Sequence, residues 1–267
     1  MKSITNVGLA EVTALYSGAQ GGFMQILFGE QIHIGGMKGS IELAERAEIK
    51  PGSSGIDLCC CNGADMRWLV RFRGVASMIG VDATEGVVER GRRVSAEEGL
   101  VDRIKIMLAD ACQSGLPTAS ADFIWSQDAW CYVVDKPRLI AEAARLVRPR
   151  GVIAFTDWVE GSTRMTDAEA QRFLGMMTLA NVEDIGGYVR LLSDNACEVR
   201  VAEDTGRFPS FIELYLNMVE MQLTYDILKT LAFRNDLLQT VTEGFRFLAE
   251  LARADKIAQA RFVARRL

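Results

Sequence analysis

The 267-residue chain is predicted to be an α/β protein with a doubly wound, mostly parallel sheet of seven strands and a helical lid. Three observations predict this class. Between about residues 50 and 160, short apolar or β-branched runs alternate with segments of helical period, as in βαβ units. Several of these runs end in acidic or amide residues. The regions on both sides of this alternation are mostly helical.

The core elements are expected in chain order. The expected strands are SSGIDLCC (53–60), VASMIGVD (75–82), RIKIMLAD (103–110), ADFIWSQ (121–127) and GVIAFTDW (151–158). The expected helices between them are ADMRWLVRFRG (64–74), EGVVERGRRVSAEEG (85–99) and KPRLIAEAARLV (136–147). Gly74 and Gly99 end the first two helices, and Pro137 lies near the start of the third. Each crossover is expected to be right-handed, which places helices on both faces of the sheet.

The flanking regions are expected to build the lid and the last two strands. The N-terminal region is helical in pattern, with a glycine-containing break at 31–40. CEVRVAEDT (197–205) and AQARFVARRL (258–267) alternate like strands and are expected to pair with each other. The expected division is a lid segment at 1–50, a Rossmann-like core at 51–208 and 257–267, and a helical insertion at 209–256 that completes the lid.

Composition and charge narrow the expected partners. The 30 basic and 35 acidic residues give a net charge of −5, so neither nucleic acid nor an anionic membrane is expected as a partner. No run approaches about 18 apolar residues and the start has no signal-peptide pattern, so a cytoplasmic protein is expected. A small molecule is the expected partner. The helical stretch 217–233 suits a homodimer face or an active-site cap equally.

The stretch GIDLCCCNGAD (55–65) contains three of the six cysteines. Zinc sites usually pair two CxxC-like or CxxH-like units, whereas this chain has one histidine, His33, and no second cluster. Neighbouring strand residues also point to opposite faces, and a disulfide between neighbours would be strained. No metal site and no redox site are therefore expected. The cysteines at 59, 60, 61, 112, 131 and 197 are interpreted as free thiols.

A cofactor loop is the remaining interpretation of this stretch. Such a loop needs a strand, a tight turn, a helix and an acidic residue about 20 positions on that binds ribose hydroxyls. Asp82 lies 19 residues after Gly63 and meets that requirement. The loop lacks the G-x-G-x-x-G of NAD sites, and Asp57 precedes it. Polar residues also end the other expected strands, where ligands bind in open α/β sheets.

The ordered segments GIDLCCCNGAD, GVDATE, ADACQSGLP, ADFIWSQDAW and AARLVRPRGVIAFTDW resemble the class I methyltransferases that use S-adenosylmethionine. The first motif of that class is an acidic residue followed by G-x-G-x-G. The resemblance covers about residues 20–205 and the last strand, and it implies a Rossmann-like methyltransferase fold. FGEQIHIGG (28–36) and WSQDAW (125–130) look most like the sarcosine and dimethylglycine N-methyltransferase group. A small amine is therefore the first expected acceptor, with S-adenosylhomocysteine as the product.

The resemblance implies a set of cofactor-binding residues. Asp57 would organise the loop, and Cys59, Cys61 and Gly63 occupy the three motif-glycine positions beside the methionine part. Asp82 and Ala83 would bind the ribose, Asp110 and Ala111 the adenine, and Gln127 would flank the methionine part. Glycine serves such loops through positive φ and close backbone approach, and cysteine is poor at both. Weaker cofactor binding or a repacked loop is therefore expected.

Methyl transfer needs alignment of the reacting atoms and exclusion of water, and an amine acceptor must also lose a proton. His33 and Asp128 are the candidate catalytic groups, with Tyr16 as a weaker third. Trp130 and Trp158 could wall a methylated ammonium group by cation–π attraction. The alternatives are a locally packed histidine, an Asp128 that caps a turn, and tryptophans that pack the lid.

Two other functions remain open at this point. Because cysteine replaces two motif glycines, the chain could be a degenerate relative with a binding or regulatory role. The acceptor atom could also be oxygen, carbon or arsenic. For arsenic, Cys131 and Cys197 lack a convincing partner pattern.

Overall fold

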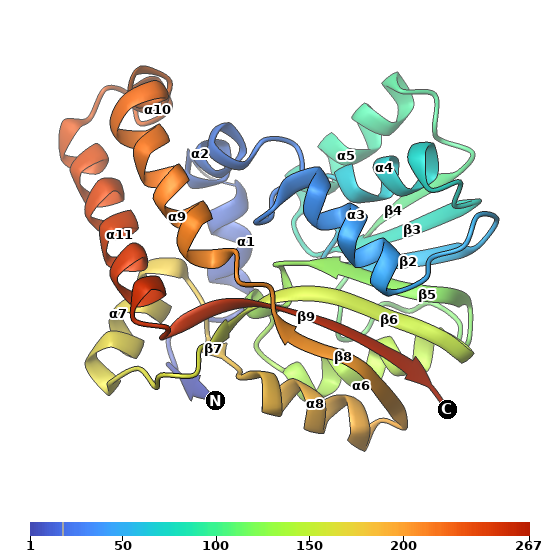
Figure 1. Ribbon diagram of the computed structural model, residues 1–267. Helices are drawn as coiled ribbons and strands as arrows, with labels where there is room; N and C mark the ends of the chain where they lie inside the picture. Colours follow the sequence, from blue (N-terminus) through green and yellow to red (C-terminus); the bar gives the residue numbers. More distant parts are fainter. Residues whose placement is uncertain (18) are drawn as a thin grey trace.

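The computed structural model describes residues 1–17 and 19–267, and in them the main sheet has seven strands in the order β4-β3-β2-β5-β6-β9-β8 (Figure 1). The strands are β2 (Ser54–Leu58), β3 (Ser77–Asp82), β4 (Ile104–Leu108), β5 (Ala121–Gln127), β6 (Val147–Glu160), β8 (Cys197–Asp204) and β9 (Ile257–Arg266). The first five pair in parallel, and β9 runs antiparallel between β6 and β8. The predicted doubly wound, mostly parallel sheet is confirmed, as is the pairing of its last two strands.

Helices cover both faces of this sheet. On one face lie α3 (Gly36–Arg46), α4 (Ala64–Phe72) and α5 (Glu85–Glu97), and on the other lie α6 (Lys136–Leu146) and α8 (Ile185–Asp194) (Figure 1). Each face has its own apolar core, with Leu43 and Phe123 in one and Leu139 and Tyr188 in the other. Because both faces are covered, β2 is buried from Gly55 to Leu58, the acidic Asp57 included.

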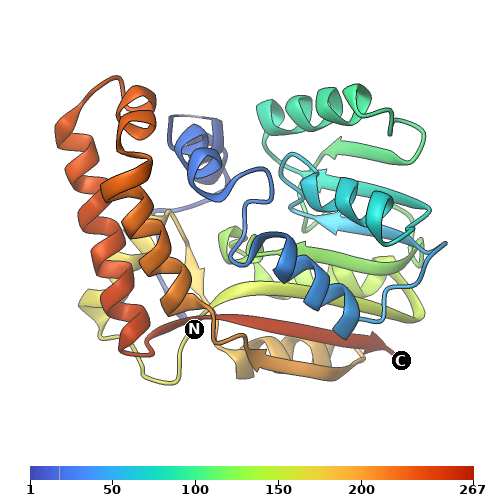
Figure 2. The same cartoon turned by 45° about the horizontal axis from the view of Figure 1, so that its top comes forward.

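The remaining helices form a group beside the sheet, where the lid is expected. They are α1 (Leu9–Ser17), α2 (Ala19–Phe28), α7 (Asp167–Met177), α9 (Phe208–Asn217), the π-helical turn η2 (Met218–Gln222), α10 (Thr224–Thr230) and α11 (Asn235–Arg253). A separate apolar cluster that includes Phe23, Phe173 and Phe208 holds all of them except α1 together, and α1 packs against α2. Figure 2 shows α9, α10 and α11 next to α1 and α2. β9 begins opposite Glu160, so the lid stands at the edge where β6 ends.

The N-terminal region differs from its expected role in one helix. α3 was included in the expected lid segment, but it packs on the sheet through Leu43 and Ala44, in the same core as α4. The helical break is also shorter than expected, because α2 ends at Phe28 and α3 begins at Gly36. The sheet and its covering helices therefore begin at about residue 36.

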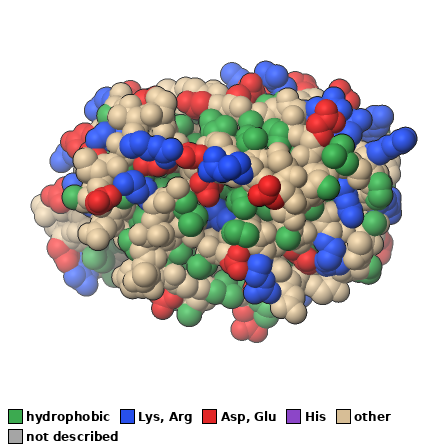
Figure 3. Space-filling model, turned by 90° about the horizontal axis from the view of Figure 1, so that it is seen from below, with side chains coloured by type: hydrophobic (Ala, Val, Ile, Leu, Met, Phe, Trp, Pro, Cys, Tyr) green, Lys and Arg blue, Asp and Glu red, His purple; other side chains and the backbone are tan. Residues whose placement is uncertain are grey.

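Two short elements complete the fold. β1 (Lys2–Ser3) pairs antiparallel with β7 (Asn181–Val182), and the 3₁₀ turn η1 (Trp130–Tyr132) follows β5. Within the described residues, no helix combines the length and the apolar character needed to cross a membrane. The face in Figure 3 carries Lys and Arg side chains interspersed with Asp and Glu. That face therefore presents no broad basic area of the kind that binds a phosphate backbone.

Candidate functional site

A cavity lies at the carboxyl ends of β2, β3 and β5, under α1 and the loop 29–35. It encloses about 1250 Å³ of empty space, its mouth included. Its lining includes these residues singled out from the sequence: Tyr16, His33, Asp57, Cys59, Cys61, Asp82, Ala83, Asp110, Ala111, Gln127 and Asp128.

The loop after β2 has the backbone of a glycine loop although it contains cysteine. Cys59 has φ 67° and Cys61 has φ 50°, and Gly63 at the start of α4 has φ 76°. An L-residue in this region costs about 1–3 kcal/mol, so surrounding groups have to hold it. Cys59 N donates to Val81 O at 2.8 Å. Cys61 N donates to Asp82 Oδ2 at 2.9 Å. The loop therefore has the backbone conformation of a glycine loop but carries cysteine side chains at two of its positions.

Asp82 and Asp57 give the cavity an acidic floor. Asp82 also accepts from Thr84 N at 2.9 Å, so each of its carboxylate oxygens accepts one backbone N–H. Burial raises the pKa of Asp82, and these donors oppose the rise. Asp57 is 3% exposed, and its carboxylate oxygens accept no hydrogen bond from any described residue. Burial, helped by Asp65 and Asp82, raises the pKa of Asp57 well above its ordinary value. Such a carboxyl group favours a cationic ligand.

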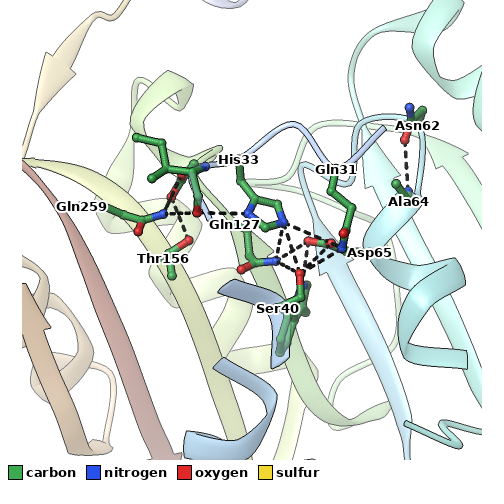
Figure 4. Close-up of polar contacts among 12 residues, drawn as sticks. Gln31, His33, Ser40, Asn62, Ala64, Asp65, Gln127, Thr156 and Gln259 are labelled. Atoms are coloured by element: carbon green, nitrogen blue, oxygen red, sulfur yellow. Dashed lines mark hydrogen bonds and ion pairs between the residues drawn. The ribbon is translucent and has the colours of Figure 1, made fainter. Parts of the chain in front are cut away.

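Asp65, in the first turn of α4, is the centre of a polar network that the sequence analysis missed (Figure 4). Its carboxylate oxygens contact side chains from three other segments: Gln31 Nε2 at 2.6 Å, Gln127 Nε2 at 2.6 Å, Ser40 Oγ at 3.2 Å, His33 Nε2 at 3.3 Å and Trp125 Nε1 at 3.3 Å. Burial alone would raise the pKa of Asp65, but His33 and the amide donors hold it well below its usual range. The one feature of the sequence that could have indicated Asp65 is its place as an acidic residue just after the loop.

His33 is part of this network and is poorly suited to act as a base. The residue is 4% exposed. Its Nε2 lies 3.3 Å from Asp65 Oδ1, and its Nδ1 lies 3.3 Å from Ile34 O. Burial would lower the pKa of His33, but Asp65, Asp128 and the Ile34 carbonyl outweigh it and raise the pKa above 6.5. The interpretation of a packed, locally bonded histidine therefore accounts for its contacts.

Asp128 links strands instead of facing a reacting group. It accepts from Ile34 N at 2.8 Å, from Thr156 Oγ1 at 2.8 Å and from Gln259 Nε2 at 2.8 and 2.9 Å (Figure 4). Its backbone is left-handed, with φ 51°. These contacts connect the end of β5 to β6, to β9 and to the loop 29–35. Asp128 is not the cap of η1 either, because that turn has no side-chain cap.

Tyr16 lies in the cavity wall beside a second tyrosine. Its ring packs edge-to-face on Tyr132, with 5.4 Å between the ring centroids. Burial raises the pKa of Tyr16 well above 10, and it raises that of Tyr132 as well. Both phenols therefore stay neutral at physiological pH. The sequence analysis did not single out Tyr132, because its partner lies on a helix far along the chain.

The expected aromatic wall is wrong. Trp130 is fully buried, and its Nε1 donates to Leu58 O at 3.2 Å. Trp158 is 6% exposed and packs on Phe208 of the lid. Neither lines the cavity. Each ring is buried in the apolar core. A position near the end of a strand does not show whether a side chain points into the cavity or into the core.

Gly63 also lies outside the cavity lining. A Cβ atom at this position would come within 2.8 Å of Met66 Cε and 3.1 Å of Ile106 Cδ1. The glycine therefore lets α4 start close to the sheet. Elsewhere in the described residues, no group of three His, Cys, Asp or Glu side chains is placed to hold a metal ion, and the six cysteines are free.

The fold is the Rossmann-like fold of solved methyltransferase structures. Residues 56–155 match the family model described as a methyltransferase domain. This match covers 100 of the 267 residues, so the stretch 56–155 is similar to a methyltransferase domain.

Known proteins are similar to part of this chain. The chain is 30% identical over 153 residues to the methyltransferase GfsG of Streptomyces halstedii, and the match covers 57% of this chain and 55% of that protein. It is 30% identical over 151 residues to dimethylglycine N-methyltransferase of Parasynechococcus marenigrum (strain WH8102), covering 51% and 52%. The chain spans about half or less of the length of the first curated relatives it matches.

Two solved structures share the fold. One is a candidate sarcosine dimethylglycine methyltransferase from Galdieria sulphuraria, with a TM-score of 0.75 and 24% identity over 85% of this chain and 83% of that one. The other is phosphoethanolamine N-methyltransferase 2 of Haemonchus contortus, in complex with S-adenosyl-L-methionine. Its TM-score is 0.81, with 17% identity over 98% of this chain and 60% of that one.

Proposed function

We propose that the protein transfers a methyl group from S-adenosylmethionine to a small molecule, with an amine as the first candidate acceptor. The observation that carries this proposal is the left-handed loop at Cys59–Cys61, tied to the Asp82 carboxylate inside a large cavity. The similarity of residues 56–155 to a methyltransferase domain supports it, as does the dimethylglycine N-methyltransferase among the relatives.

The residues present fit the cofactor. In this proposal Asp57, Cys59 and Cys61 surround the methionine part, and Gln127 flanks it. Asp82 with Ala83 binds the ribose hydroxyls, and Asp110 with Ala111 binds the adenine. Gly63 shapes the turn without touching the ligand, because it faces Met66 and Ile106. Asp57 is the buried acidic group that a cationic methyl donor would neutralise.

The chain's own contribution is placement and exclusion of water. When bound, the donor would supply a methyl group on an activated sulfonium. In the transfer, the acceptor's lone pair forms a bond to the methyl carbon, and the electron pair of the broken C–S bond stays on sulfur. The acceptor's proton passes to water. α1 covers the cavity through Val12 and Tyr16, which keeps bulk water from the reacting atoms. His33 and Asp128 are held by other protein groups, so they position the loop 29–35 and do not accept the proton.

Titration calorimetry with S-adenosylmethionine and S-adenosylhomocysteine tests this proposal. We expect both to bind at one site with micromolar affinity. Absence of binding to either at millimolar concentration, by protein shown to be folded, would overturn it.

The same titration separates an enzyme from a degenerate relative. If binding appears only after Cys59→Gly and Cys61→Gly are combined, the natural chain has abandoned the cofactor. We expect the wild-type protein to bind without this change, because its loop already has the glycine-like backbone.

A further inference from the structure

We propose that the methyl acceptor carries no carboxylate or phosphate group and is a neutral or cationic small molecule. This inference rests on the proposed function and narrows its substrate class. The observation behind it is the charge of the cavity lining. Among the described lining residues, one side chain is a Lys or Arg, namely Arg138. The acidic side chains of the same lining are Glu30, Asp57, Asp65, Asp82, Asp110, Asp128 and Asp135.

The cations near the cavity are already engaged. His33 is paired with Asp65, with 3.3 Å between Nε2 and Oδ1. Arg67 and Arg90 both pair with Glu30, at 3.2 and 2.9 Å, and neither lines the cavity. An anionic acceptor would therefore have to displace an existing ion pair before it gained one of its own.

Lys136 is buried behind the cavity and is engaged as well. Its Nζ donates to Val133 O at 3.0 Å and to Asn181 Oδ1. It does not line the cavity. Although Asp157 lies close enough to raise its pKa, burial dominates and lowers the pKa of Lys136. This lysine therefore braces the turn after β5 and offers no charge to a ligand in the cavity.

Arg138 stands at the end of the cavity assigned to adenine. It is exposed in the first turn of α6, where its charge acts on the Cys112 thiol. Cys112 Sγ lies 3.6 Å from Asp135 O, and Cys112 follows Asp110 and Ala111 along the chain. If the cofactor lies as proposed, Arg138 is beside its base and not beside its methyl group.

The wall left for the acceptor is largely apolar. Once the proposed cofactor residues are set aside, the lining from α1 and the turn after β5 is Leu9, Val12, Thr13, Tyr16, Ala129, Tyr132, Val133 and Val134, with Asp128 and Asp135 at the two ends of the turn. Moving a carboxylate or phosphate from water to such a wall, with no cation to pair it, costs several kcal/mol. Two of the relatives are named for dimethylglycine and phosphoethanolamine, whose acidic groups would find no free partner here.

Matched acceptors test this inference directly. Turnover is measured as S-adenosylhomocysteine release for pairs that differ in one acidic group: ethanolamine and phosphoethanolamine, dimethylethanolamine and dimethylglycine, p-cresol and p-hydroxybenzoate. In each pair that reacts, we expect kcat/KM to be at least about 100-fold higher for the member without the acidic group, which corresponds to about 2.7 kcal/mol. An equal or higher value for the acidic member would overturn the inference. Calorimetric binding of the cofactor, measured first, shows separately whether the proposed function itself fails.

A second measurement needs no acceptor at all. Thr13 lines the cavity from α1 and is half-buried, so Thr13→Cys places a thiol in the wall left for the acceptor. A cationic and an anionic methanethiosulfonate of similar size report the local potential through their relative rates of labelling at this position, identified by peptide mass. An exposed cysteine introduced by Gln239→Cys on α11 supplies the reference ratio. We expect the cationic reagent to be favoured at position 13 by at least about tenfold over the reference. An equal or reversed ratio would contradict an acidic cavity and the inference with it.

Discussion

Cys59 and Cys61 occupy left-handed backbone that glycine adopts without cost, and neighbouring groups hold them there. Val81 O and the Asp82 carboxylate accept the N–H groups of this loop. Both thiols line the cavity, and burial raises their pKa values, with that of Cys61 reaching about 12. The thiols are therefore neutral at physiological pH. At the scale of the residue, they act as small apolar wall groups and not as nucleophiles.

Replacing either cysteine with glycine should relieve backbone strain. We expect the free energy of unfolding of Cys59→Gly or Cys61→Gly to stay equal or rise by up to about 1 kcal/mol, because the relief slightly exceeds glycine's extra entropy in the unfolded chain. Cys60→Gly is the matched control: Cys60 is 6% exposed in the core, so its loss should cost about 2 kcal/mol. Urea unfolding measures all three. Equal destabilisation at the three positions would contradict the assignment of strain.

Asp65 and His33 form the second residue-scale feature, and it predicts a pH dependence. The raised pKa of His33 gives stability that is complete below about 6.5 and is lost as pH rises through the higher folded value. The lowered pKa of Asp65 gives stability that is present above about 3.8 and is lost only as pH falls further. At pH values between about 3.8 and about 6.5, both contributions are present, so the ion pair between His33 and Asp65 is fully formed.

Asp65→Asn should remove this pH dependence. We expect the substitution to cost about 3 kcal/mol at about pH 5.5 and clearly less at about pH 8.5, because the charge that Asp65 stabilises on His33 is lost as pH rises through the raised pKa of His33. Urea unfolding at the two pH values measures the difference, and Asp102→Asn on the exposed surface is the control. If the loss in the free energy of unfolding caused by Asp65→Asn is the same at both pH values, Asp65 acts only through neutral donors.

At the scale of the element, β9 joins the lid insertion to the site. Gln259, in β9, is fully buried and donates both to Asp128 and to Ile34 O, the latter at 3.0 Å. The last strand therefore holds the loop 29–35 against the end of β5. No described residue of the insertion 209–256 lines the cavity, so its proposed role in the lid is to support α2 from behind.

Gln259→Ala should weaken cofactor binding although Gln259 is not in the cavity wall. Its loss leaves the buried Asp128 carboxylate short of donors, so we expect about 1–3 kcal/mol lower stability and several-fold weaker binding of S-adenosylhomocysteine. Gln239→Ala on the exposed face of α11 should change neither quantity. Unchanged binding in a destabilised Gln259→Ala protein would separate this strand from the site.

Most elements of the core could be predicted from the sequence, because buried parallel strands form continuous apolar runs that glycine and proline separate. β2, expected at 53–60, spans Ser54–Leu58, and β8 and β9 pair as expected. The placement of α3 could not be predicted, because an amphipathic helix shows that it has a partner but not which one. β1 and β7 are two residues each and too short to leave a pattern.

The site was predictable only where it follows strand ends. Asp57, Asp82, Asp110 and Gln127 come directly from that rule. The Asp65 network joins residues 34 and 62 positions apart, and no local pattern records such pairings. Trp130 shows the opposite error: its position was correct, but the side chain turns into the core.

At the scale of the whole molecule, the sheet supplies an acidic cavity floor and α1 supplies an apolar cover. Two of the side chains that could serve as a base, His33 and Asp128, are committed to holding the loop 29–35. An acceptor amine must therefore lose its proton to water before or during transfer.

The rate of methyl transfer should accordingly follow the pKa of the acceptor. For two amines of different basicity, we expect the pH midpoint of kcat/KM to move with the amine, since the neutral form is the one that reacts. His33→Asn should leave that midpoint in place. A midpoint shared by both amines and displaced by His33→Asn would identify the histidine as the base.

In the proposed function, this cavity binds the methyl donor through the loop after β2 and through Asp82 at the end of β3. The most direct measurement is calorimetric titration of S-adenosylhomocysteine into the wild-type protein, Asp82→Ala and the exposed control Asp102→Ala. We predict equal affinity for the wild type and the control, and affinity at least about tenfold weaker for Asp82→Ala. Equal binding by all three folded proteins would contradict this proposal.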